Sequence, residues 1–270
     1  MTYRLFEEKH HASLYQRYRF VPPDAVKELI LQYLDKKKGK LVLAVDVGCG
    51  TGQNTRLLAP HFQEVVGIDI SECQLEEARA VPGFPNATYR AGTAEDLPFP
   101  EGSVDLLAAA SAAHWFHPQR FLGEVERILK PGGCVSLLGH SDNLELQYGT
   151  CGDRLSCLYK EVREFLSPYA SSQVAVANSR LQGLFDSIAF PDKERIENIA
   201  TKICLSVRDL MGWIESFSYY QAYLRAEPEA ATTLLKSTQD RFLEEMGVSS
   251  PDTMLEVELK YFCVLACKPQ

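Results

Sequence analysis

The stretch Leu41-Val42-Leu43-Ala44-Val45-Asp46-Val47-Gly48-Cys49-Gly50-Thr51-Gly52 decides the fold of this chain. A short apolar run enters a G-x-G-x-G turn, and a helix-like segment follows from Gln53. Glycines at such a turn let the backbone reverse tightly and lie against a ligand at the carboxyl end of a strand. The stretch therefore predicts a strand, a ligand-binding glycine loop and a helix, as in α/β proteins with nucleotide-type sites.

The composition fits a compact α/β chain and limits its partners. Of the 270 residues 46% are apolar, which is enough for a substantial core. The 28 basic and 36 acidic residues give a formal charge of −8, which disfavours nucleic acid or a membrane surface as a partner. We expect a cytoplasmic monomer, because no signal-like start and no run of about eighteen apolar residues occurs. The cysteine spacing predicts no metal site.

The pattern beyond the loop predicts a doubly wound, Rossmann-like, mostly parallel sheet. Short apolar runs alternate with helix-like segments between residues 41 and 140, as in βαβ units. We expect the first five strands at 41–47, 64–70, 87–90, 104–110 and 133–139. Two later runs, 199–207 and 255–267, also look like strands. The last is expected to pair antiparallel with the main sheet, which gives seven strands in all.

Two acidic residues characterise the ligand of the loop. Asp46 stands two residues before Gly48, where a carboxylate would repel a phosphate but suits an ammonium or sulfonium group. Asp69 ends the second expected strand, 69 − 48 = 21 residues beyond Gly48, where a carboxylate can accept both hydroxyls of a ribose. Gln53 occupies the position where a dinucleotide fingerprint requires its third glycine. The site is thus expected to hold a cationic nucleoside.

Three motifs in this order carry a family resemblance: V-D-V-G-C-G-T-G at 45–52, G-I-D-I-S at 67–71 and L-K-P-G-G at 129–133. Together they resemble the class I S-adenosylmethionine-dependent methyltransferases, which implies S-adenosyl-L-methionine as cofactor. The resemblance implies that the loop glycines border the methionine part, Asp69 the ribose and Ile70 one adenine face, with Ala94 or Glu95 near the adenine amino group. The expected cofactor residues are Asp46, Gly48, Gly50, Gly52, Asp69, Ile70, Thr93, Ala94, Glu95 and Ser111.

The whole chain resembles the trans-aconitate methyltransferase-like branch, whose members cap the sheet with helices between the last two strands. Ser216-Phe217-Ser218-Tyr219-Tyr220 corresponds in position to its T-W-S-x-Y pattern, and Phe217 replaces the tryptophan. Tyr18-Arg19-Phe20-Val21-Pro22 meets only part of its opening, because the tyrosine of Arg-Pro-x-Tyr-Pro is missing. The branch implies a small carboxylic acid as acceptor, which Arg19 or another arginine would hold.

This resemblance and the helix-like patterns divide one domain, 1–270, into four segments. They are an N-terminal helical segment (1–40), a cofactor-binding core (41–140), a helical cap with a late strand (141–255) and the last strand (256–270). Helices are expected at 22–34, 155–166, 179–188, 207–224 and 230–246.

The fourth strand leads into Ser111-Ala112-Ala113-His114-Trp115 at the edge where ligands collect in open α/β folds. His114 could act as a general base or a hydrogen-bond donor there, and Trp115 as a wall, although both could simply pack the next helix. His140 follows the fifth strand and is a second candidate. Aromatic residues at helical spacing between 213 and 223 are more typical of core packing. The expected acceptor residues are Tyr18, Arg19, Trp115, His140, Phe217 and Tyr220.

Methylation of a small carboxylic acid on oxygen is the leading hypothesis. A carboxylate is already an anion and needs no base, whereas a phenol, amine or thiol could require His114 to take a proton. The alternatives are another acceptor, such as a phenol, an amine or a protein, and a non-catalytic module that only binds S-adenosylmethionine. Nucleic-acid methylation is disfavoured, because Ser111-Ala112-Ala113-His114 lacks the prolines that amino-methylating enzymes of this fold carry there.

Overall fold

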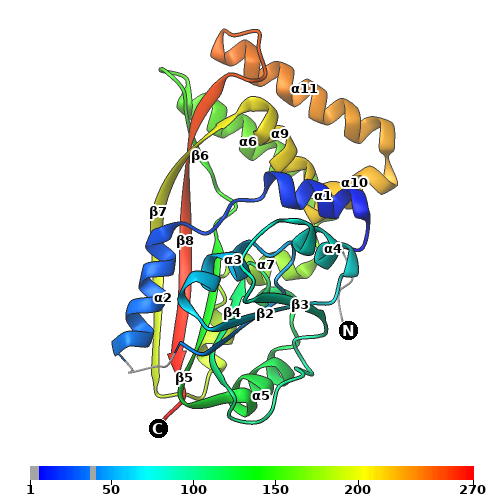
Figure 1. Cartoon of the computed structure of the whole chain (residues 1–270). Coiled ribbons are helices and arrows are strands. Elements are labelled where there is room, and N and C mark those ends of the chain that lie inside the picture. The colour runs from blue at the N-terminus through cyan, green and yellow to red at the C-terminus, as the bar shows by residue number, and fades with distance from the viewer. Residues whose placement is uncertain (1–5, 37–40) are drawn as a thin grey trace.

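The computed structural model describes residues 6–36 and 41–270, and its described strands form one sheet. The first five lie parallel in the order β3-β2-β1-β4-β5, and β8 runs antiparallel beside β5. This confirms the doubly wound, mostly parallel architecture with an antiparallel last strand (Figure 1). The bounds are β1 Leu43–Val47, β2 Glu64–Asp69, β3 Ala87–Ala91, β4 Val104–Ala110, β5 Leu129–His140 and β8 Met254–Cys267.

The far edge of the sheet differs from the expectation of seven strands, since eight occur among the described residues. β8 extends beyond the end of β5. The half of β8 after residue 260 pairs with β5, and its earlier half pairs with the short β6 (Glu145–Gln147). The late strand, β7 (Asp192–Ser206), pairs with β8 from end to end. It begins seven residues before the expected position 199, because charged residues on this edge strand conceal its first half in the sequence.

Helices cover both faces of the sheet because successive strand residues point to opposite sides. Ala44 of β1 packs with the helices α2 and α3, whereas its neighbour Val45 packs on the other side with α5 and α8. α4 packs on β2 and β3. The bounds are α2 Asp24–Lys36, α3 Gln53–Leu58, α4 Glu72–Ala80, α5 Pro118–Ile128 and α8 Gln182–Ser187, with short 3-10 helices at Ala59–His61, Ala113–Trp115 and Ser167–Tyr169.

The upper parts of β7 and β8 extend beyond the parallel strands and carry a group of helices that we call the cap (Figure 1). It consists of α6 (Gly152–Leu166), α9 (Val207–Glu215), α10 (Ser218–Ala226) and α11 (Pro228–Met246). The helix expected at 207–224 is broken into α9 and α10. The Ser216 hydroxyl donates back to the carbonyl of Trp213 at 2.7 Å, and Phe217 is extended. The break places Trp213 and Phe217 on one inner side of the cap.

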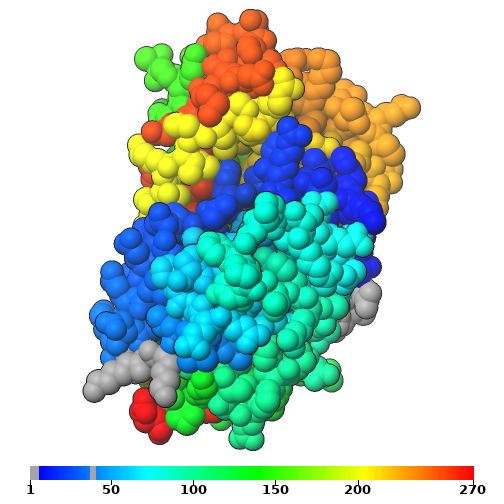
Figure 2. All heavy atoms as spheres, in the orientation of Figure 1, coloured from blue at the N-terminus to red at the C-terminus, as the bar shows by residue number. Residues whose placement is uncertain are grey.

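The N-terminal segment joins the two halves of the molecule. Helix α1 (Lys9–Tyr18) packs against α4 of the core and α9 of the cap. Figure 2 shows this dark blue segment lying between the core and the cap. Ser71 donates from its hydroxyl to the carbonyl of Phe6 at 2.6 Å, and His11 Nε2 lies 2.9 Å from the Ser216 carbonyl. The segment therefore bridges core and cap beside the glycine loop.

The segment between the cap and β7 also differs from expectation. The helix expected at 179–188 is present as the shorter α8, and an additional helix, α7 (Ser172–Asn178), precedes it. Arg180 and Leu181 separate them with φ angles of 54° and 56°, a left-handed conformation that helices do not contain. Across the two described ranges, no helix combines the length and apolar character needed to cross a membrane.

Candidate active site

The glycine loop, Gly48–Gly52, lies where the carboxyl ends of β1, β2 and β4 meet. Gly48, Gly50 and Gly52 have φ angles of 66°, 53° and 84°, which L side chains rarely adopt. A Cβ on Gly48 would lie 2.5 Å from the Cβ of Ala112, and one on Gly52 would lie 2.5 Å from the Tyr89 hydroxyl. Both conformation and space thus require glycine here.

Asp69 fixes the loop from the end of β2. One carboxylate oxygen accepts the backbone N–H of Gly50 at 2.8 Å, and the other accepts that of Ser71 at 2.8 Å. Burial raises the pKa of Asp69, and these N–H donors act in the opposite direction. Since an ionised carboxylate has about four acceptor sites, Asp69 is held rigidly and retains capacity for a ligand.

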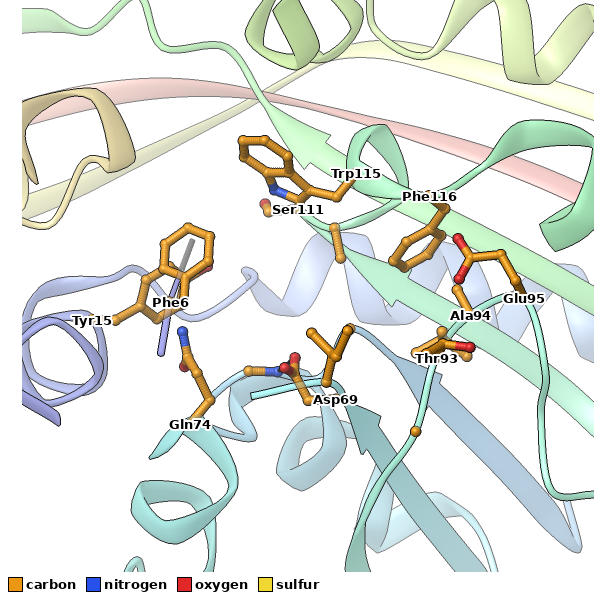
Figure 3. A pocket seen from close by; sticks show the side chains of 16 residues that line it. Phe6, Tyr15, Asp69, Gln74, Thr93, Ala94, Glu95, Ser111, Trp115 and Phe116 are labelled. Carbon is orange, nitrogen blue, oxygen red and sulfur yellow. Dashed lines mark hydrogen bonds between the residues drawn. The ribbon is translucent and has the colours of Figure 1, made fainter. Parts of the chain in front are cut away.

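A cavity of about 760 Å³, which we call the loop cavity, opens beside these residues (Figure 3). It contains most of the expected cofactor residues, brought together from β2, β4 and the turn after β3. Those lining it are Gly48, Gly50, Asp69, Ile70, Thr93, Ala94, Glu95 and Ser111.

The loop cavity also contains residues that sequence reasoning missed. Phe6 and Tyr15 line it from the N-terminal segment, across from Phe116 (Figure 3), and the Phe6 ring lies 6.3 Å from that of Trp115. No motif marks the first two, because they reach the site only through the packing of α1. Gln74 could have been found, because it stands three residues beyond the N-cap residue Ser71 and so in the first turn of the helix that follows Asp69.

A smaller recess, the bridging pocket, lies on the other side of the loop and contains Asp46. Asp46 is fully buried and accepts the Thr55 hydroxyl at 2.6 Å and the Asn54 amide at 2.8 Å. Burial raises its pKa to about 6. Asp46 therefore orients the start of α3 in addition to placing a negative charge beside the loop.

Three buried amide atoms beside the loop find no hydrogen-bond partner among the described residues: Gln53 Nε2, Asn54 Oδ1 and Gln74 Oε1. The opposite ends of two of these amides are fixed, since Gln53 Oε1 accepts the Thr51 hydroxyl at 2.8 Å and Asn54 donates to Asp46. One donor and two acceptors are thus left for a ligand. Leaving such groups unpaired would cost roughly 1 to 3 kcal/mol each.

These groups fit S-adenosylmethionine. Its methionine part carries a carboxylate, which needs donors, and an ammonium, which needs acceptors, while the ribose hydroxyls suit Asp69 and Gln74. The apolar side chains of Ile70, Ala94 and Phe116 line the same cavity and suit a flat adenine ring. Both the polar and the apolar residues present therefore match the cofactor implied by the sequence.

A second cavity, which we call the cap cavity, has about 690 Å³ of empty space that is continuous with solvent, and it shares Ser111, Ala112 and Trp115 with the loop cavity. His114 and His140 line it. Burial lowers the pKa of His114 to about 4, and burial likewise lowers the pKa of His140. Both imidazoles are neutral at pH 7. The His114 ring has no hydrogen bond to any described residue, whereas His140 Nδ1 lies 3.2 Å from the Ser141 carbonyl.

Arg19 lies between the cap cavity and the bridging pocket and lines both. Its Nη2 donates to the Ser216 carbonyl at 3.1 Å, and its guanidinium lies 4.6 Å from the Trp213 ring centroid and 5.2 Å from that of Phe217. Its Nε is buried without a partner, and no described carboxylate pairs with it. Arg19 therefore offers free donors and an uncompensated positive charge.

Of the expected acceptor residues, Arg19, Trp115, His140 and Phe217 line the cap cavity, together with His114. Tyr18 and Tyr220 do not line it, and their contact with the acceptor stays a prediction. Tyr18 packs on Gly212 of α9, where an added Cβ would lie 2.6 Å from its ring, and Tyr220 donates to the Ala231 carbonyl at 3.0 Å. Gly52 lines neither cavity nor pocket and serves the turn into α3.

Comparison with known proteins identifies the family. The model for the methyltransferase domain family matches residues 45–137. A Dictyostelium discoideum protein named as a methyltransferase is 30% identical over 261 residues, covering 89% of this chain and 90% of the relative. A Saccharomyces cerevisiae protein named as an S-adenosylmethionine-dependent methyltransferase is 25% identical over 241 residues, covering 78% of this chain and 81% of the relative.

Solved structures show the same fold. A type II methyltransferase from Anaeromyxobacter dehalogenans superimposes with a TM-score of 0.75 at 23% identity, covering 94% of this chain and all of the other. Phosphoethanolamine N-methyltransferase 2 from Haemonchus contortus, in complex with S-adenosylmethionine, gives a TM-score of 0.51 at 19% identity over 97% of this chain and 58% of the other. The chain therefore belongs to the class I S-adenosylmethionine-dependent methyltransferases.

Proposed function

We propose that this methyltransferase methylates the carboxylate oxygen of a small acid. The observation that carries the proposal is Arg19, whose buried Nε lacks a partner and whose side chain lines the cap cavity without an ion pair to any described carboxylate. A guanidinium matches the geometry of a carboxylate, and charge-assisted hydrogen bonds of this kind are among the strongest in proteins. An acid bound there would supply the partner that Arg19 lacks.

On the cofactor side, we propose that Asp69 and Gln74 accept the ribose hydroxyls, while Gln53 and Asn54 bind the methionine carboxylate and ammonium. Asp46 acts indirectly, because it fixes the Asn54 amide and the start of α3. These roles follow from which atoms are already paired and which remain free. With the cofactor bound in this way, its methyl group would meet the acceptor at the wall that the two cavities share, around Ser111 and Trp115.

The transfer itself is a displacement at carbon. When bound, S-adenosylmethionine supplies the methyl group, so that an oxygen lone pair of the acid forms the O–C bond as the C–S electrons return to sulfur. The products are a methyl ester and S-adenosylhomocysteine. The chain contributes by holding the acid on Arg19 and by excluding water with Phe6, Tyr15 and Trp115. Positioning of this kind can supply roughly 7 to 11 kcal/mol of the barrier.

His114 favours a second candidate function. A neutral imidazole without a partner, lining the acceptor cavity, can take a proton from a phenol or an amine. With an acid as acceptor no base is needed, and His114 would instead donate a hydrogen bond to the carboxylate. The two candidates therefore assign opposite roles to the same ring.

The proposal is tested by supplying the purified protein with S-adenosylmethionine and matched panels of small carboxylic acids, phenols and amines. We expect S-adenosylhomocysteine release with acids, together with products whose mass and hydrolysis in alkali identify methyl esters. Turnover confined to phenols or amines would contradict the proposal and support the second candidate.

The role of Arg19 is tested in the same assay. Arg19→Gln should raise the KM for the acid by at least about tenfold, because one charge-assisted hydrogen bond contributes roughly 1.5 to 3 kcal/mol. Arg17→Gln is the matched control, since Arg17 is exposed and two residues away. A rise in the KM for S-adenosylmethionine with an unchanged KM for the acid would assign Arg19 to the cofactor and remove the support for the carboxylate.

The His114→Ala variant, measured across a pH range, separates the two roles of His114. Because its pKa is lowered to about 4, His114 stays neutral as pH rises from there. With an acid acceptor, already ionised at neutral pH, we expect kcat/KM to be flat above about pH 7 and to decline toward pH 6 as Asp46, whose pKa is raised to about 6, protonates. His114→Ala should leave cofactor affinity unchanged and lower transfer to the acid only modestly. A loss of more than about a hundredfold in kcat would instead indicate a general base.

A further inference from the structure

The cap cavity contains a second charged side chain that the proposed function does not use. Asp142 follows β5 by two residues and lines the cavity together with Arg19. Its side chain is 21% exposed, so it is largely withdrawn from bulk water. A carboxylate in this position faces whatever acceptor the cavity holds.

The carboxylate of Asp142 is only loosely compensated. Its nearest cation is Arg163, whose Nη2 lies 3.7 Å from Oδ2, beyond hydrogen-bond distance. Arg163 donates instead from Nη1 to Asn143 Oδ1 at 2.5 Å. The Tyr159 hydroxyl donates to the backbone carbonyl of Asp142 at 3.1 Å, not to its side chain. No described residue therefore donates a hydrogen bond to this carboxylate.

Asp142 and Arg19 make the cavity bipolar. Burial dominates the lowered pKa of His114 and His140, and on both rings Asp142 acts to raise the pKa while Arg19 acts to lower it. The opposite charges thus act on the same two imidazoles. Apolar side chains, including Val174, line the rest of the cavity and suit a short carbon skeleton.

We infer that the acceptor is an acid that also carries an ammonium group, bound with its carboxylate toward Arg19 and its ammonium toward Asp142. This inference rests on the proposed function, from which it takes the carboxylate. An ammonium would supply the hydrogen bonds that the Asp142 carboxylate lacks. A second carboxylate in the same place would meet a like charge in a poorly solvated cavity, so simple diacids are disfavoured.

The experiment compares acids that differ only in the amino group. Butanoic, hexanoic and octanoic acid are each paired with their α-amino and ω-amino derivatives, and kcat/KM is measured from S-adenosylhomocysteine release. For at least one pair we expect kcat/KM to be about tenfold or more higher for the amino acid than for the plain acid, because a single charge-assisted hydrogen bond can have an effect of this size. Fragment masses should place the methyl group on oxygen. Methylation on nitrogen would overturn the orientation and the inference with it.

Variants then test whether Asp142 is the cause. Asp142→Asn keeps the shape but removes the charge, and should reduce the preference for the amino acid to about one, whereas Asp142→Glu should retain it. Asp35→Asn, at an exposed position on α2, is the control with the same change in charge and should retain the full preference. Melting temperatures verify that each variant folds.

The outcomes separate this inference from the proposed function. If plain acids are methylated and Asp142→Asn leaves the preference unchanged, Asp142 is only the structural partner of Arg163, and the inference fails while the proposed function stands. If plain and amino acids alike yield no ester while phenols or amines react, the proposed function itself fails, and the inference fails with it.

Discussion

We expect the Gly48→Val protein to fold and to lose measurable binding of S-adenosylmethionine. Gly48 has a φ of 66°, which a β-branched residue adopts only with strain, and its Cβ would lie 2.5 Å from Ala112 Cβ and 3.1 Å from Phe116 Cζ. The new side chain would occupy the loop cavity itself. Strain and overpacking each cost the fold roughly 1 to 3 kcal/mol. Binding is lost because the valine side chain occupies the space that the ligand needs.

The measurement is a titration calorimetry or thermal-shift experiment on both proteins. A ligand at about a hundred times its Kd stabilises the folded protein by roughly 2.7 kcal/mol, and this shift should be absent in the variant. Gly123→Val is the matched control, because a Cβ on Gly123 of α5 meets nothing within 4 Å. Unchanged affinity in a folded Gly48→Val protein would contradict the placement of the cofactor.

The second large effect is expected from Asp69→Ala, which should weaken cofactor binding by at least about thirtyfold. The change removes the proposed ribose acceptors, each bond contributing roughly 1.5 to 3 kcal/mol, and releases the backbone N–H groups of Gly50 and Ser71. Because burial raises the pKa of Asp69, its carboxylate protonates at a higher pH than an exposed one. The affinity of the wild-type protein for S-adenosylmethionine should therefore begin to decline at a higher pH than it would with an exposed aspartate.

Asp69→Asn separates the two contributions, because it retains one acceptor oxygen and the size of the side chain. We expect an affinity between those of the wild type and Asp69→Ala, measured as Kd by calorimetry, with circular dichroism to verify the fold. A wild-type Kd for the alanine variant would show that Asp69 only holds the loop and does not touch the ribose.

The core of the fold was predictable because its signals are local. The apolar run into Gly48 marks the end of β1, and Pro131-Gly132-Gly133 marks the end of α5 within a few residues, although these residues already belong to β5. The expectation of seven strands was wrong because it omitted β6. These three residues form a strand only because β8 extends past β5 and pairs with them. Likewise, no periodicity reveals the break between α9 and α10, which depends on the side chain of Ser216.

The candidate site likewise has one part that the sequence predicts and another that depends on contacts between distant segments. Asp69 and Thr93 line the loop cavity because motif spacing places them at strand ends, which a sequence can indicate. Phe6 and Tyr15 reach that cavity only through the docking of α1. Asp142 becomes a candidate only because Arg19 lines the same cavity. Contacts between distant segments carry no local signal, so the acceptor half of the site was the less predictable part.

The position of β8 has a consequence for how the chain folds. This strand, Met254–Cys267, lies between β5 and β7 and also pairs with β6, so the end of the sheet and the base of the cap both depend on it. During synthesis it leaves the ribosome after the other described strands. Until then β5 and β7 expose unpaired edges, a state prone to aggregation. We therefore expect slow, late completion of the native structure, dominated by contacts between residues far apart in sequence.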